Sequence, residues 1–185
     1  MSEWFDTLEG LLAELWQGLA RGVAQRDAPA RHPTFATVSA DGWPETRLVV
    51  LRAAKRDIAR VEIHTDLYSA KVSSLTAQPR AELHIWDGAA RLQTRMRCNV
   101  SITHGIDAAE TWEKVPDPSR QSYGIAPSPG HPIAAALAYK KRPALDSFAV
   151  LHCQIEKIDV VYLGDKHRRA VFMRHDNWVG QWCAP

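Results

Sequence analysis

The feature that most constrains the fold is a series of segments in which apolar and polar residues alternate, joined by short turn sequences. The segment 34–39 alternates in this way and is followed by the pair Asp41-Gly42, and a second pair, Asp87-Gly88, separates two more such segments. Alternation with a period of two is typical of half-buried β-strands, and Asp-Gly is typical of hairpin turns. Because strands joined by hairpins pair antiparallel, the pattern predicts an antiparallel sheet.

The same patterns place the remaining elements. We expect strands at residues 34–39, 45–52, 61–65, 80–86, 90–103, 148–163 and 168–173, with a short last one at 178–182. Short helices are expected at 68–77, 107–114 and 133–139. The segment 115–132 holds five of the eleven prolines and is expected to be an irregular loop. Many strands with few, short helices predict an antiparallel barrel that carries helical decorations.

The N-terminal segment follows a helical period instead. Apolar residues recur at helical spacing between Leu8 and Val23, and acidic residues lie near the expected start of the helix. Ser2 is the candidate N-cap, and the helix should end near Arg26. We expect it to pack on the body of the domain or on a partner chain.

Length and charge limit the class of protein. A chain of 185 residues fits one domain, with an arm at residues 1–28 and a barrel with decorations at 33–185. The formal net charge of +2 is too small for a protein that coats nucleic acid. No apolar run could cross a bilayer, and the acidic start is unlike a secretory signal. We therefore expect a cytoplasmic protein without nucleic-acid or membrane partners.

Common catalytic and metal-binding motifs are missing from the sequence. The three cysteines (Cys98, Cys153 and Cys183) are scattered, and no histidine pairs with a carboxylate or thiol at metal-ligand spacing. The sequence has no GxGxxG, P-loop, HExxH or GxSxG signature. We therefore expect no metal site, and no side chain is identified as a catalytic nucleophile.

Cations and hydroxyl groups gather at the ends of predicted strands instead. Arg47 and Arg52 bracket an apolar strand, on opposite faces because strand side chains alternate. The segment 65–71 runs from a strand into a helix start, where backbone N–H groups, the Ser69 hydroxyl and the Lys71 ammonium could hold a phosphate. A capped surface helix with a solvated lysine explains this segment equally well.

A third candidate is the polar side of the segment 91–97. Arg91, Gln93, Arg95 and Arg97 share one face of this expected strand. A glutamine can donate to and accept from an amide-like heterocycle, whereas the simpler interpretation is an exposed sheet face. A surface for anions or nucleic acid is a further alternative, and it predicts strongly salt-dependent binding.

Taken in order, these segments resemble the pyridoxamine 5'-phosphate oxidase-like, FMN-binding split-barrel family. Residues 47–52 are similar to its R-x-V-L-x-K strand, 64–71 to its Y-T-x-x-x-S-x-K segment, and 93–98 to its Q-V-R-I-x-G strand. Residues 148–159 are similar to its F-x-V-x-x-x-x-I-E-x-I-E strand, and His167-Arg168 and the ending 178–185 to its closing motifs. The resemblance runs from about Pro33 to the C-terminus.

The resemblance implies a mainly β (α+β) fold, a six-stranded antiparallel split β-barrel with an N-terminal helix and short peripheral helices. It implies a homodimer with FMN at the subunit interface and a small-molecule substrate. The implied cofactor-binding residues are Arg47, Leu48, Val49, Arg52, His64, Thr65, Ser69, Lys71 and Gln93. Of these, Arg47, Ser69 and Lys71 would hold the FMN phosphate, and Gln93 would reach the flavin ring from the second subunit. Arg52 and Arg168 are the implied residues for an anionic substrate.

The sequence departs from this family where a substrate would bind. Ala70 replaces the oxidase's second cation, His64 replaces its tyrosine, and Arg52 replaces its lysine. Its substrate-binding Tyr, Arg and Ser have no clear counterparts within 107–122. We expect an FMN-dependent oxidoreductase. The alternative is a flavin-binding or flavin-storing protein, or one that binds another cofactor such as haem or a deazaflavin, without pyridoxamine phosphate oxidase activity.

Overall fold

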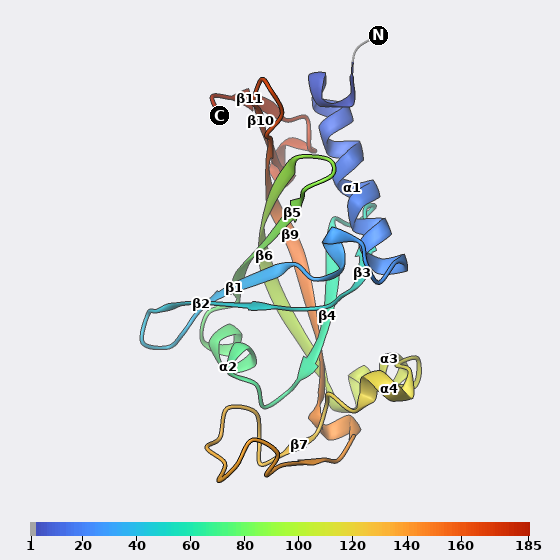
Figure 1. The fold of residues 1–185 in the computed structure, drawn as a ribbon, viewed down its shortest axis with the longest axis vertical. Helices are drawn as coiled ribbons and strands as arrows, with labels where there is room; N and C mark the ends of the chain where they lie inside the picture. The colour runs from blue at the N-terminus through green and yellow to red at the C-terminus, as the bar shows by residue number, and fades with distance from the viewer. Residues whose placement is uncertain (1–2) are drawn as a thin grey trace.

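The computed structural model describes residues 3–185, and its main feature is one branched antiparallel sheet of nine strands (Figure 1). The strands of this sheet are β1 (Thr34–Val38), β2 (Pro44–Leu48), β3 (Leu51–Lys55), β4 (Arg60–Asp66), β5 (Arg80–Asp87), β6 (Leu92–His104), β9 (Phe148–Tyr162), β10 (Arg168–Met173) and β11 (Gln181–Cys183). A separate pair is formed by β7 (Ile125–Ala126) and β8 (Lys140–Lys141). The helices are α1 (Leu8–Ala24), α2 (Ala70–Ala77), α3 (Ala109–Glu113) and α4 (Asp117–Arg120).

The long strands β6 and β9 form the spine of the sheet. One edge of β9 pairs with β6 along most of its length. The other edge is divided, because its first half pairs with β4 and its second half with β10. On the far side of β6 the order continues through β5 and β1 to β2, while β3 pairs only with β4. The mainly antiparallel β fold is thus confirmed. The sheet is not closed by this pairing, and a split barrel of six strands stays a prediction.

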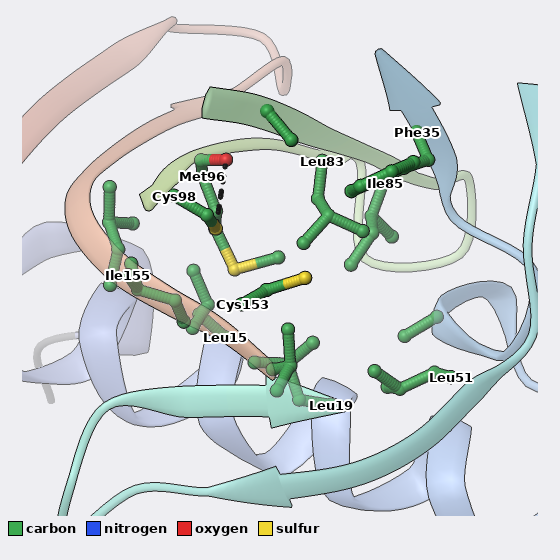
Figure 2. Close-up of a cluster of buried hydrophobic side chains, with 14 of the residues drawn as sticks. Leu15, Leu19, Phe35, Leu51, Leu83, Ile85, Met96, Cys98, Cys153 and Ile155 are labelled. Atoms are coloured by element: carbon green, nitrogen blue, oxygen red, sulfur yellow. Dashed lines mark hydrogen bonds between the residues drawn. The ribbon is translucent and has the colours of Figure 1, made fainter. Parts of the chain in front are cut away.

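The core lies between the inward side chains of the sheet and helix α1. Leu11, Leu15 and Leu19, on one face of α1, are almost completely buried, as expected for apolar residues at helical spacing. In Figure 2, Leu15 and Leu19 point toward apolar side chains of the sheet strands, among them Leu83 and Met96. The N-terminal helix therefore packs on the body of its own chain.

A second, smaller core lies at the start of β9. Tyr123 and Phe148 are buried there with ring centroids 5.0 Å apart, and Trp112 of α3 lies 5.2 Å from Phe148. These aromatic contacts hold the segment 105–124 against the sheet. They fix α3 on one side of β4, whereas Figure 1 shows α2 on the other side.

Several sequence predictions of elements need correction. The predicted strand 45–52 is two strands, because the chain changes partners: β2 pairs with β1, whereas β3 pairs with β4. No helix forms at 133–139, a stretch in which Leu137 is 81% exposed. Without a surface to pack on, a short apolar run gains nothing from helix formation.

The other boundaries differ by a few residues. Helix α1 starts at Leu8, capped by Thr7 Oγ1, which accepts a hydrogen bond from the Gly10 N–H at 3.0 Å. The predicted cap Ser2 lies outside the described residues. The predicted helix 107–114 is a 3₁₀ turn followed by α3, and the predicted loop 115–132 contains α4 and β7. In residues 3–185 no helix is both long and apolar enough to cross a membrane.

Candidate functional site

Three of the predicted residues meet where β4 runs into α2. Lys71 Nζ donates a hydrogen bond to Thr65 Oγ1 at 3.0 Å, and Thr65 Oγ1 lies 3.3 Å from Ser69 Oγ. Ser69 Oγ donates to the backbone oxygen of Asp66 at 2.8 Å. Thr65 and Ser69 are buried, so the lysine is held against the start of α2. The positive end of a helix dipole and an ammonium group together favour an anion at this position.

Arg47 reaches the same region from β2. Its guanidinium donates to Thr37 Oγ1 at 2.7 Å and to Glu45 Oε2 at 2.9 Å. Glu45 Oε2 also accepts from Ser74 Oγ of α2 at 3.2 Å, which ties β2 to the helix. We call Arg47, Thr65, Ser69 and Lys71 the β4–α2 cluster.

The two cations of this cluster differ in whether a carboxylate neutralises their charge. Arg47 has the Glu45 carboxylate as an ion-pair partner, whereas the ion pairs within residues 3–185 do not include Lys71. The pKa of Lys71 is lowered, first by burial and then by the positive charge of Arg47. A phosphate beside Lys71 would favour its charged form and so offset both effects. The residues present therefore fit the phosphate of FMN.

Leu48 and Val49, which follow Arg47 in the chain, differ in their exposure to solvent. Leu48 is 69% exposed, next to the half-buried Arg47, whereas Val49 is buried. This matches a strand that presents one face to the core, since neighbouring side chains point to opposite sides. The exposed Leu48 is a large apolar side chain that residues 3–185 leave mostly uncovered.

Arg52 of β3 and His64 of β4 lie on the other side of the sheet from this cluster. His64 packs edge-on against Phe148, with 5.1 Å between ring centroids, and lines a pocket together with Arg52. Burial, followed by the positive charge of Arg52, lowers the pKa of His64 to about 4. The neutral imidazole and Arg52 are therefore separated from Lys71 by the strand itself. Within one chain, the structure does not bring these two residues to the β4–α2 cluster.

Gln93 lies far from the cluster in the same chain. It is paired with Trp86 and Val161, whereas Thr65 pairs with Ala149, which lies opposite His104. Gln93 and His104 are about 36 Å apart along β6, at about 3.3 Å per residue. In Figure 1 the β5–β6 turn lies beside β10 and β11, at the other end of the molecule from α2.

Arg168 lies at the same end of the sheet as Gln93, and its side chain contacts residues near the N-terminus. Its guanidinium pairs with Asp6 at 2.5 Å and lies 4.8 Å from the Phe5 ring centroid. Phe5 in turn stacks on Tyr162, with ring centroids 4.2 Å apart. An anionic substrate would have to compete with Asp6 for this arginine.

The arginines considered for an anion or nucleic-acid surface all have carboxylate partners. Arg95 Nη2 pairs with Asp159 at 2.7 Å, and Arg97 and Arg91 pair with Glu82 and Asp165 at 3.2 and 3.3 Å. Asp159 also accepts from Arg169. These pairs reduce the positive charge that the face could offer to an anion.

Sequence reasoning missed some residues that shape the cluster. The contact of Glu45 with Arg47 could have been predicted, because the two residues are two apart on a strand and so share one face. No sequence pattern predicts the role of Asp66. Its carboxylate accepts hydrogen bonds from the N–H groups of Tyr68 at 2.9 Å and of Gly124 at 2.8 Å. The second contact joins segments that are distant in the sequence, and only the folded chain shows it.

Comparison with known proteins shows the family to which the chain belongs. The family model for the pyridoxamine 5'-phosphate oxidase, FMN-binding domain, matches residues 12–104. The chain is 24% identical to pyridoxine/pyridoxamine 5'-phosphate oxidase 2 of Arabidopsis thaliana, covering 91% of this chain and 92% of that protein. It is 31% identical to pyridoxine/pyridoxamine 5'-phosphate oxidase of Hyphomonas neptunium, covering 70% of this chain and 57% of that protein.

Solved structures show the same relationship. A pyridoxamine 5'-phosphate oxidase-related, FMN binding protein from Nostoc punctiforme has a TM-score of 0.77 at 25% identity, covering 94% of this chain and 96% of that one. PhzG from Burkholderia lata, in complex with tetrahydrophenazine-1-carboxylic acid, has a TM-score of 0.73 at 17% identity, covering 94% and 92%, and shares the fold. The matched segment contains the β4–α2 cluster and Gln93. The chain belongs to the pyridoxamine 5'-phosphate oxidase, FMN-binding domain family.

Proposed function

We propose that this protein binds FMN and uses it to oxidise or reduce a small anionic substrate. The observation that carries the proposal is the β4–α2 cluster, in which Lys71 has no carboxylate partner within residues 3–185 and lies beside Arg47. Bound FMN would supply the hydride-transfer chemistry, so that no protein nucleophile is required. The task of the protein is to hold the phosphate, orient the flavin ring and position the substrate.

In this proposal the residues have separate tasks. Arg47 and Lys71 neutralise the phosphate by charge-assisted hydrogen bonds. Ser69 holds the phosphate together with these two cations. Thr65 fixes the lysine and lines the cofactor together with the backbone of Leu48 and Val49. Arg52 and Arg168 remain candidates for the anionic substrate.

We further propose a homodimer in which Gln93 of the second copy completes the flavin site. The distance between Gln93 and the cluster within one chain supports this arrangement, because only another copy could bring the amide to the ring. Two large apolar side chains, Leu48 and Trp86, are 69% and 47% exposed. Such residues gain stability when a partner covers them.

The test compares FMN with riboflavin, which lacks the phosphate. The fluorescence of FMN should be quenched when FMN binds to the wild-type protein. Lys71→Gln should weaken FMN binding by about ten- to a hundredfold, the loss expected for a charge-assisted bond. Riboflavin should bind more weakly, and Lys71→Gln should leave its affinity unchanged. Lys166→Gln, at an exposed lysine, is the matched control. Equal FMN affinity in the wild-type and Lys71→Gln proteins would contradict the phosphate assignment.

A second candidate is a flavin carrier without turnover. It is favoured by the residues around α3, where Glu110 pairs with Lys114 and Trp112 packs on Phe148 in place of a polar substrate site. Oxygen consumption with pyridoxamine phosphate and pyridoxine phosphate separates the two. Bound FMN without turnover of either compound favours the carrier or a different substrate.

A further inference from the structure

Trp86 of β5 lies directly opposite Gln93 of β6 in the antiparallel pair. Both side chains point out of the sheet on the same face, because their neighbours in the two strands, Ile85, Leu92 and Thr94, are buried in the core. The Cβ atoms of directly opposed residues are about 4.5–5.5 Å apart. A molecule that contacts the Gln93 amide from outside the chain is therefore within reach of the indole ring.

The indole ring has no packing role within the described part of the chain. Trp86 is 47% exposed and belongs to neither of the two hydrophobic cores that residues 3–185 form. Its ring leans toward the β5–β6 turn, where a Cβ added to Gly88 would lie 3.5 Å from Nε1. Single exposed aromatic residues are common on protein surfaces, so the exposure of Trp86 alone indicates nothing, whereas its place beside Gln93 does.

Trp86 is the aromatic end of a row of residues that crosses the sheet on this face. From Gln93 the row continues through Val161 of β9 and Arg169 of β10 to Cys183 of β11, since each residue pairs with the next. The row thus places a flat apolar ring on one side of the amide and a guanidinium farther away on the other side. An amide and a flat ring side by side suit a heterocycle that has polar atoms at its edge and two apolar faces.

This contact cannot form with the cluster of the same chain. Gln93, which lies opposite Trp86, is about 36 Å along β6 from His104, at about 3.3 Å per residue, and the strand pairing places His104 close to Thr65. A flavin held by the phosphate at the β4–α2 cluster can therefore meet the indole of a second copy only.

We propose that Trp86 of the second copy packs against the flavin ring, so that one copy holds the phosphate and the other covers the ring. The proposal rests on the proposed FMN binding and homodimer, and it adds a cofactor-binding residue to that site. Because the indole meets the ring system, its contribution to affinity does not depend on the phosphate.

The first test separates ring binding from phosphate binding. Trp86→Ala should weaken the binding of FMN and of riboflavin by the same factor, about three- to tenfold, as for loss of an aromatic contact, whereas Lys71→Gln should weaken FMN binding alone. Bound flavin should also fluoresce more strongly in Trp86→Ala, because an indole in contact with a flavin quenches it by electron transfer.

Trp182→Ala is the matched control. Trp182 is also 47% exposed, but it lies opposite the buried Ala170 and so belongs to the other face of the sheet. Trp182→Ala should change neither affinity nor the fluorescence of bound flavin.

The second test identifies the copy that supplies the ring. Lys71→Gln and Trp86→Ala chains with different affinity tags are combined, and dimers that contain one chain of each kind are isolated. If the cluster of one copy works with Trp86 of the other, one site of this mixed dimer carries both substitutions and the other carries neither. Half of the sites should then bind FMN with wild-type affinity, although neither parent protein has such a site.

The outcomes distinguish this proposal from the one on which it rests. A wild-type protein that binds no FMN would overturn the proposed function and the role of Trp86 together. If Lys71→Gln weakens FMN binding and Trp86→Ala does not, only the role of Trp86 is overturned. A Trp86→Ala protein that becomes monomeric in light scattering would show that protein covers the indole instead, and a mixed dimer without a wild-type site would exclude contact across the two copies. Either result overturns the proposal.

Discussion

His64 and Thr65 are neighbours on β4, and their side chains leave the strand on opposite faces. Thr65 accepts a hydrogen bond from Lys71 at 3.0 Å, whereas His64 packs against Phe148 and lines the pocket with Arg52. Two adjacent residues of β4 therefore face two different groups of cations. Each group has one member, Lys71 or Arg52, without a carboxylate partner among residues 3–185. In the proposed function, β4 is the wall between the phosphate of the cofactor and the anion of the substrate.

Acid should destabilise the protein through His64. Its pKa is about 4 in the folded chain and 6.5 in the unfolded one, so between these values the unfolded chain binds more protons. The free energy of unfolding should fall as the pH is lowered from about 6.5 to about 4, and His64 contributes at most about 3 kcal/mol, less where solvent reaches the ring. Above pH 6.5 this contribution is fully present.

Urea unfolding at pH 7.5 and pH 5 measures this effect. His64→Gln should lose part of the difference between the two pH values, whereas His175→Gln, at a histidine whose side chain is 70% exposed, should keep it. The same pH difference in the wild-type and His64→Gln proteins would show that His64 does not titrate as described.

Asp66 should couple the β4–α2 turn to the segment that begins at Gly124. Its two carboxylate oxygens accept backbone N–H groups from Tyr68 and Gly124. In Asp66→Asn an NH₂ group replaces one oxygen, so that a hydrogen-bond donor faces a backbone N–H donor. We expect a loss of about 1–3 kcal/mol in the free energy of unfolding. Hydrogen exchange of the Gly124 amide should become faster. Asp57→Asn, in an exposed loop, is the control; an unchanged Gly124 exchange rate would contradict the coupling.

Gly124 should tolerate no side chain. Its φ is +106°, and an added Cβ would lie 2.0 Å from the backbone oxygen of Arg142. Gly124→Ala therefore combines left-handed strain of about 1–2 kcal/mol with a backbone clash. Gly130 has a φ of +88° with open space around it, so Gly130→Ala carries the strain alone. Thermal unfolding should show Gly124→Ala as clearly the less stable variant, and equal stabilities would rule out the clash.

Leu48 should contribute to the proposed dimer interface. A charged residue at this exposed position leaves the fold of one chain intact, because its side chain contacts solvent in the single chain. Burying that charge between subunits would be unfavourable. Leu48→Glu should therefore shift the protein from dimer to monomer in light scattering and weaken FMN binding. Ile106→Glu, at an 84% exposed residue, is the control, and a Leu48→Glu protein that stays dimeric would place the interface elsewhere.

The sequence by itself determined the features that depend on neighbours in the chain. The alternation at 34–39 and 91–97 predicts strands, because a strand repeats every two residues. The segment 65–71 brings Thr65, Ser69 and Lys71 together, since a strand end and a helix start position them locally. Local sequence was misleading at 133–139, where a helix needs a surface to pack on, and at 45–52, where the chain passes from pairing with β1 to pairing with β4.

Only the tertiary structure decided which distant segments meet. The pairing of β4 with β9 places Glu62 opposite His152, and the packing of Trp112 and Tyr123 on Phe148 brings α3 over the same face. Neither contact leaves a local pattern in the sequence. Strand pairing and aromatic packing are selected by the burial that the whole chain achieves, so the cluster at 65–71 could be predicted from the sequence and the pocket on the other face of β4 could not.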